Sequence, residues 1–239
     1  MKINITWRYA AAFLFLTILC GTSHEFVHHF AGAAVCGEFG YKTFNSFVLP
    51  EACRANPYKL WATAAGPLFT FALVWLGLYQ MRRADEKSKR LGFALIFANF
   101  PVNRLLFALL GGNDEQYIAQ QLFGKSALAY WLVNFIIWLC VLPPLYFAYR
   151  EIANRFKFLW FAGFFILPFV FVVLFAGLFL ENYLLLERKI LAETIFGIPY
   201  LIMLVEAFCL TGYALTRKYL YRTIEVEKYK SEETILQTS

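Results

Sequence analysis

Two histidines and a glutamate near the N-terminus have the spacing of a metal-dependent hydrolytic site. His24 and His28 are one helical turn apart, so on a helix both ring nitrogens can reach one metal ion. Glu25 lies about 100° further round the same helix, where its carboxylate can take a proton from water. These polar groups are costly within apolar sequence unless something compensates them. The pattern therefore favours metal binding over histidines that only pack helices.

The third metal ligand must be an acid or a cysteine, because all three histidines of the chain lie close together. His29 points about 100° away from its neighbour and is expected to pack or to support the site. A catalytic zinc site commonly has three protein ligands and one open position. Asp114 is the first candidate and Glu115 the second, since Gly111 and Gly112 let the backbone bend. The alternative for both acids is a solvated loop after a helix end.

Two of the cysteines, Cys36 and Cys53, fall in or beside the first predicted loop. A disulfide and a metal-binding role are both open for this pair, although their spacing is not that of a zinc knuckle. Cys36 as the third ligand would need the first helix to break early. The other cysteines, Cys20, Cys140 and Cys209, lie in apolar segments and are expected to be small buried hydrophobes.

The elements that carry these residues are predicted to be membrane helices. The chain has 239 residues, of which 60% are hydrophobic, and a mean hydropathy of +0.56. This is too apolar for an ordinary soluble domain. A hydrocarbon core of roughly 30 Å is crossed by about 20 apolar residues. Six segments are long enough, namely residues 9–35, 60–81, 91–110, 127–149, 158–180 and 191–216. We therefore expect an all-α polytopic membrane protein with one transmembrane domain, residues 1–216, and a polar tail, residues 217–239.

The basic residues predict how the chain is oriented in the membrane. With a cytoplasmic N-terminus, fifteen Lys and Arg residues fall in cytoplasmic segments and six in outer loops. Both termini are therefore expected in the cytoplasm of a cell that holds this protein in its plasma or inner membrane. The first and third helices then both run outward, so His24, His28 and Asp114 meet near the outer face. The net charge of +6 comes from short clusters at helix ends, which favours lipid headgroups as partners and not nucleic acid.

Prolines interrupt two predicted helices next to polar residues. Pro67 and Pro101 each remove a backbone hydrogen bond, which can make room beside a polar site. Asn99 and Arg104 should face protein or water instead of lipid. Arg104 is predicted to pair with an acid such as Glu206, which lies well inside the last helix.

Taken in order, these motifs resemble those of the site-2 protease family of intramembrane zinc metalloproteases. The resemblance covers about residues 15–118 and implies a metalloprotease core at about 9–118, with residues 127–216 as extra helices. It is carried by His24-Glu25-Phe26-Val27-His28, Ala64-Ala65-Gly66-Pro67-Leu68, and Asn99-Phe100-Pro101 before an aspartate.

The resemblance implies roles for the site residues. His24, His28 and Asp114 are expected to bind zinc, and Glu25 is expected to be the general base. The implied reaction is hydrolysis of a peptide bond in a membrane protein or peptide. Family members usually open toward the cytosol, so the charge distribution predicts an inverted relative that acts from outside. Three alternatives stay open: an inactive scaffold or regulator of the same fold, a transporter with a polar ion path, and a lipid-directed metallohydrolase.

Overall fold

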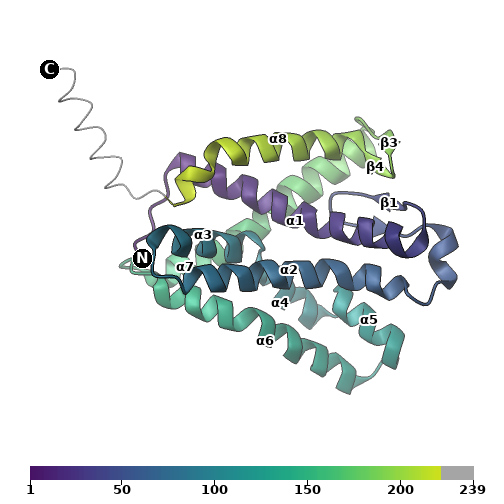
Figure 1. Cartoon of the computed structure of the whole chain (residues 1–239), viewed down its shortest axis with the longest axis horizontal. Helices are drawn as coiled ribbons and strands as arrows, with labels where there is room; N and C mark the ends of the chain where they lie inside the picture. Colours follow the sequence, from purple (N-terminus) through teal and green to yellow (C-terminus); the bar gives the residue numbers. More distant parts are fainter. Residues whose placement is uncertain (222–239) are drawn as a thin grey trace.

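The described part of the chain, residues 1–221, is mostly helical in this computed structural model (Figure 1). Within it, six helical segments are long and apolar enough to cross a membrane. Their bounds are Trp7–Cys36, Lys59–Met81, Glu86–Phe123, Ala127–Glu151, Lys157–Glu187 and Tyr200–Leu220. The prediction of an all-α chain with six segments able to cross a membrane is confirmed, which indicates a multi-pass membrane protein. The cytoplasmic location of both termini stays a prediction. Most of the predicted polar tail, residues 222–239, lies outside the described residues.

Helix α1 (Trp7–Cys36) is the element against which the others are arranged. Thr6 caps its start by accepting a hydrogen bond from the Tyr9 backbone, and Gly37 ends it in a left-handed conformation. In Figure 1, α1 lies between α8 (Tyr200–Thr216) above and α2 (Lys59–Met81) below, and it packs against both. Its 30 residues give a length of about 45 Å, so it is longer than the hydrocarbon core it crosses.

The loop between α1 and α2 folds back over the end of α1. It contains the antiparallel strands β1 (Tyr41–Lys42) and β2 (Phe47–Val48), followed by the 3-10 helix η1 (Glu51–Ala55). Cys36 and Cys53 form a disulfide with their Cα atoms 5.2 Å apart. Of the two roles open for this pair, the structure has the disulfide.

The third apolar segment is broken into three helices, α3 (Glu86–Ala98), α4 (Pro101–Leu110) and α5 (Asp114–Phe123). The first break follows from Phe100, whose φ is +33°, and from Pro101, which starts α4 and cannot continue the hydrogen-bond ladder of α3. The second break follows from Gly111 at φ +72°. The predicted interruption at residues 99–101 is confirmed, and the whole apolar segment extends further than predicted, from Glu86 to Phe123 instead of over residues 91–110.

The second half of the chain supplies the remaining walls of the bundle. Its elements are α6 (Ala127–Glu151), α7 (Lys157–Val172), the π-helix η2 (Val173–Glu187), β3 (Thr194–Ile195), β4 (Ile198–Pro199), α8 and the 3-10 helix η3 (Arg217–Leu220). The last helix was predicted to begin at residue 191 and begins at Tyr200, because the preceding residues form the β3–β4 hairpin. Gly197 at φ +74° makes its turn, and its carbonyl accepts a hydrogen bond of 3.0 Å from the Lys42 backbone of β1. The two hairpins are thus joined.

Aromatic packing and close backbone contact hold the helices together at the end of the bundle opposite the hairpins. Phe13 of α1 and Phe93 of α3 pack edge-on against Phe164 of α7, with ring centroids 5.3 and 5.0 Å from it. Helices α2 and α3 touch through Gly77 and Gly92, since a Cβ on Gly92 would lie 2.3 Å from the Gly77 carbonyl oxygen. This packing fixes α1, which carries His24 and His28, and α2, which contacts both rings.

Candidate metal centre

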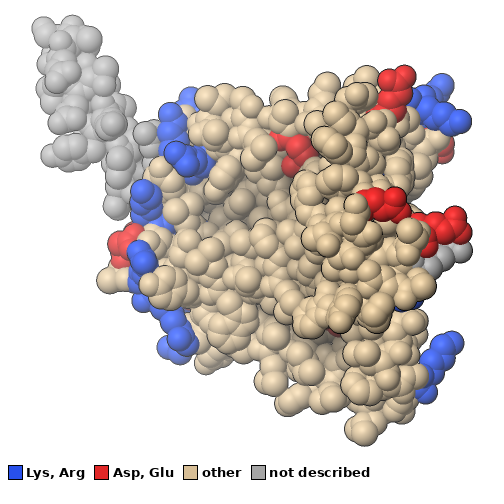
Figure 2. Space-filling model, turned by 45° about the vertical axis from the view of Figure 1, so that its right-hand side comes forward, with Lys and Arg blue, Asp and Glu red and all other residues tan. Residues whose placement is uncertain are grey.

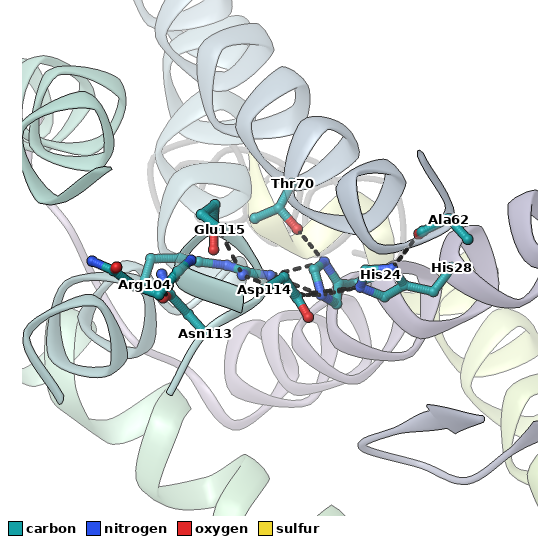
Figure 3. Close-up of polar contacts among 9 residues, drawn as sticks. His24, His28, Ala62, Thr70, Arg104, Asn113, Asp114 and Glu115 are labelled. Carbon is teal, nitrogen blue, oxygen red and sulfur yellow. Dashed lines mark hydrogen bonds and ion pairs between the residues drawn. The ribbon is translucent and has the colours of Figure 1, made fainter. Parts of the chain in front are cut away.

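His24, His28 and Asp114 converge although 86 residues separate the second histidine from the aspartate along the chain (Figure 3). One ligand atom from each residue lies within 4.8 Å of the others. The two histidine Nε2 atoms are 3.0 Å apart, and Oδ2 of Asp114 is 3.4 Å from each. One turn of α1 therefore places both imidazoles on one face, as their spacing predicts, and the start of α5 brings the carboxylate.

Helix α2 orients both imidazole rings. Nδ1 of His28 donates a hydrogen bond of 2.8 Å to the Ala62 carbonyl, which leaves its Nε2 with a free lone pair. Nδ1 of His24 lies 2.9 Å from the Thr70 hydroxyl, which can accept its proton in the same way. Both rings are buried, at 8% and 1% exposed. The metal-binding edges of the two rings thus face each other.

Gly66 allows this arrangement because the His28 ring lies directly against the backbone of α2. A Cβ at residue 66 would be 2.2 Å from Nε2 of His28. On the opposite face, the ring of Phe47 from β2 stacks on the imidazole, with centroids 4.3 Å apart and planes 11° apart. The His28 ring is therefore packed between the backbone of α2 at Gly66 and the ring of Phe47.

The start of α5 presents Asp114 to the histidines. Asn113 caps the helix by accepting a hydrogen bond from the Gln116 backbone, and Asp114 follows in the first turn, where the helix dipole favours a carboxylate. Glu115 lies apart from the group of three, and its Oε1 is 3.8 Å from Arg104. Of the two candidate acids, Asp114 is the one that the fold brings to the imidazoles.

Arg104 of α4 lies at the same place. Its Nη2 is 2.8 Å from Nδ1 and 3.0 Å from Nε2 of His24, and its Nη1 is 3.8 Å from Oδ2 of Asp114. The predicted pairing of Arg104 with Glu206 is wrong. The break after α3 directs α4 toward α5, whose acids Arg104 meets, while Glu206 of α8 interacts electrostatically with Lys42 instead.

A cavity of about 490 Å³ opens beside two of the three candidate ligands, His24 and Asp114. Glu25 lines it together with His24 and Asp114. The facing wall consists of Phe44 and Asn45 from the β1–β2 turn and of residues from α7 and η2. The volume is within the range of small-ligand sites.

His29, the third histidine, lies outside this group. Its Nε2 donates a hydrogen bond of 2.9 Å to the Phe196 carbonyl in the β3–β4 turn, and its ring stacks on Phe39. This agrees with its interpretation as a packing residue.

The orienting residues on α2 were missed from the sequence. Ala62, Gly66 and Thr70 recur every four residues and so form one stripe on α2, which is the face that meets the histidines. This four-residue repeat of small and hydroxyl residues is the sequence pattern that could have identified the face of α2 that contacts the histidines.

Lys42 was also missed, because it was assigned to a solvated outer loop. It is 0% exposed, and its Nζ donates to the Thr43 carbonyl at 2.9 Å and lies 4.2 Å from the ring centre of Phe26. Burial lowers the pKa of the Lys42 ammonium to about 8, and the carboxylates of Glu25 and Glu206 partly oppose that shift.

The donor set fits a metal ion that accepts nitrogen and oxygen ligands. Two imidazole nitrogens with oriented Nδ1 atoms and one carboxylate oxygen leave a coordination position free toward the cavity. Neither protein-family models nor curated proteins nor solved structures give a match to the chain.

Proposed function

We propose that the protein is a membrane-embedded zinc endopeptidase that hydrolyses a peptide bond of a membrane-associated protein or peptide. The observation that carries the proposal is the convergence of His24, His28 and Asp114 beside a cavity that Glu25 also lines. The resemblance of the motifs to those of site-2 proteases supports a peptide as the substrate. The helices that enclose the site support a substrate that reaches it from the lipid bilayer.

The chemistry divides between the metal and one carboxylate. Zinc, when bound, acts as a Lewis acid on the carbonyl and makes water a better nucleophile by lowering its pKa toward about 7. Glu25 takes the proton of the attacking water and passes it to the leaving amine nitrogen. Thr70 and the Ala62 carbonyl keep the imidazoles in the orientation in which both Nε2 atoms lie near each other and near Asp114.

The cavity walls suit a peptide that has left the helical conformation. A transmembrane helix hides its amides in internal hydrogen bonds, so a scissile segment has to unwind before hydrolysis. Asn45, Asn99, Asn103 and Asn113 line the cavity and supply hydrogen-bonding groups that replace those internal bonds. An extended stretch of backbone is thereby stabilised next to the metal.

We further propose that the site opens toward the outer face of a plasma or inner membrane. Figure 2 shows a row of basic side chains along the end of the bundle where the chain begins, whereas at the opposite end basic side chains stand among acidic ones. Basic residues favour the cytoplasmic side, which leaves the hairpins and the metal centre in the outer half. The Cys36–Cys53 disulfide, at the far end of α1, supports an oxidising compartment there.

Metal analysis of the purified protein tests the centre. We expect about one zinc per chain in the wild type and its loss in His24→Ala and Asp114→Ala, because a three-ligand site loses a ligand in each. The matched control, His29→Ala, keeps the metal. Retention by Asp114→Ala together with loss in Glu115→Ala would show that the other acid is the ligand. A wild type without stoichiometric metal contradicts the proposal.

Hydrolysis is tested separately with Glu25→Gln. We expect this variant to bind zinc as the wild type does and to lose cleavage of a fluorogenic peptide library in detergent micelles, since an amide cannot accept the proton. A variant that keeps its metal and full cleavage rate would contradict the assigned base. If no peptide is cleaved even by the wild type, zinc-dependent hydrolysis of lipids and metal-independent ion flux in liposomes distinguish the remaining functions.

A further inference from the structure

Arg104 is a buried positively charged residue that lies directly beside two of the candidate metal ligands, His24 and Asp114. Its side chain is 9% exposed, and one guanidinium nitrogen lies 2.8 and 3.0 Å from the two ring nitrogens of His24. A positive charge next to a site for a divalent cation opposes metal binding. Structural packing alone would be served better by an apolar side chain, because burying a charge is costly.

Glu115 supplies the charge that balances Arg104. Both of its carboxylate oxygens are buried without a hydrogen-bond partner, and Oε1 is 3.8 Å from Nη1 of Arg104. Oδ2 of Asp114 is equally far from the same nitrogen. Glu115 therefore anchors the guanidinium beside the ligand atoms and reduces its net charge. The pair acts as an oriented set of N–H donors instead of a free cation.

The guanidinium also faces the substrate space. Arg104 lines the cavity next to His24 and Glu25. Arginine has five N–H donors in a rigid plane, more than its two acidic neighbours can align with at once. A carbonyl that reaches the three ligand atoms lies within reach of this group as well, because its Nη2 is 3.0 Å from a ligand nitrogen.

We propose that Arg104 is a catalytic residue that donates an N–H to the carbonyl oxygen of the scissile peptide bond as negative charge develops on it. This rests on the proposed function. The water oxygen bonds to the carbonyl carbon, and the C=O electron pair moves onto the oxygen that Arg104 faces. When C=O re-forms, the C–N bond breaks and the amine nitrogen takes the proton that Glu25 accepted. Glu115 is the positioning residue for Arg104.

Stabilisation of a developing oxyanion has a different signature from ground-state binding. An interaction made only in the transition state lowers kcat when it is removed and leaves KM in place. The balancing charge of Glu115 favours this role over capture of a full anion, such as a free C-terminal carboxylate. An arginine that binds such an anion would instead change KM for free-acid peptides and not for their amides.

The test compares the variants Arg104→Gln, Arg104→Lys and Glu115→Gln with the control Arg83→Gln. Arg83 lies in the loop that connects α2 to α3. At saturating zinc we expect unchanged metal content in all variants. Arg104→Gln should lower kcat roughly 100- to 1000-fold with KM within about threefold, as removal of one oxyanion donor does. Arg104→Lys should recover part of this loss, and Glu115→Gln should show a smaller loss than Arg104→Gln.

A binding measurement gives a readout independent of turnover. A phosphonamidate analogue of the cleaved peptide carries a tetrahedral anion, and its affinity for Arg104→Gln should fall in parallel with kcat. Affinity for the uncleaved peptide, measured in the Glu25→Gln background, should not change. Guanidine added to Arg104→Ala should restore part of kcat.

Three results overturn the inference. One is a kcat within about threefold of wild type in Arg104→Gln that retains zinc. Another is a change confined to KM for free-acid peptides, which indicates anion binding. The third is an Arg104→Gln variant that has lost zinc and recovers both its zinc content and its kcat when it is fully loaded with metal. That result indicates that Arg104 has only a structural role. A wild type without zinc or hydrolysis would instead contradict the proposed function itself, and the inference with it.

Discussion

Replacing Gly66 by alanine is expected to disable the metal centre while the helical bundle stays folded. The new Cβ would lie 2.2 Å from Nε2 of His28, whereas ordinary contact begins at 3.4 Å, so the imidazole must move by about 1.2 Å. Phe47 is stacked on the other face of the ring and limits where it can go. Metal–ligand distances tolerate about 0.2 Å. The displacement exceeds that several-fold, so we expect zinc affinity to fall by at least roughly 10- to 100-fold.

The assay is a zinc titration against a fluorescent chelator in detergent, with thermal denaturation of the metal-free protein alongside. The matched control is Gly163→Ala in α7, where an added Cβ would meet only Leu167 at 3.9 Å. Both changes place alanine in a helix and gain up to about 1 kcal/mol of helix propensity. The control should bind zinc as the wild type does. If Gly66→Ala is folded and binds zinc within about threefold of the wild type, the close contact described for His28 is refuted.

Three further predictions concern the surroundings of the centre. Thr70→Val removes the hydroxyl that accepts the proton of Nδ1 of His24 and should weaken zinc binding roughly 10- to 100-fold in the same titration. Cys53→Ser removes the Cys36–Cys53 disulfide, which restricts the unfolded chain by closing a loop with a sequence separation of 17. We expect the protein to be destabilised by about 3 kcal/mol, measured by denaturation with and without reductant. Lys42 has a folded-state pKa of about 8, below its unfolded value of about 10.4, so the unfolded chain binds more protons between these values and stability should rise with pH across that window. Lys42→Met should remove this slope in thermal denaturation at pH 7 and pH 10.

The sequence predicts best what depends on local pattern. The apolar segments, the one-turn spacing of His24 and His28, and the break before Pro101 all follow from residues that are neighbours in the chain. Each of these is present in the structure. Asp114 could be predicted as a candidate ligand because the glycines before it allow the backbone to turn. Gly111 adopts the left-handed conformation that makes this turn.

What depends on contacts between distant residues was not predicted. Residues 191–199 are apolar enough to extend the last helix, yet residues 194–199 form a hairpin whose Gly197 carbonyl accepts a hydrogen bond from the Lys42 backbone. The partner of Arg104 was assigned by depth in the membrane alone. The turns at Phe100 and Gly111 then decide which acids it meets, and hydropathy carries no information on that direction.

The join between the two hairpins has a consequence for biosynthesis. The histidines and Asp114 are all translated within the first half of the chain, whereas the wall of the cavity from α7 and η2, and the Gly197 carbonyl that holds β1, are translated later. Chains emerge from the ribosome N-terminus first, at about 5–20 residues per second. The nascent protein can therefore assemble its ligands seconds before it can enclose them. Until α7 and η2 are inserted, the cavity lacks the part of its wall that they supply. If the protein acts as we propose, zinc loading and the onset of proteolysis are therefore separable events in the life of each molecule.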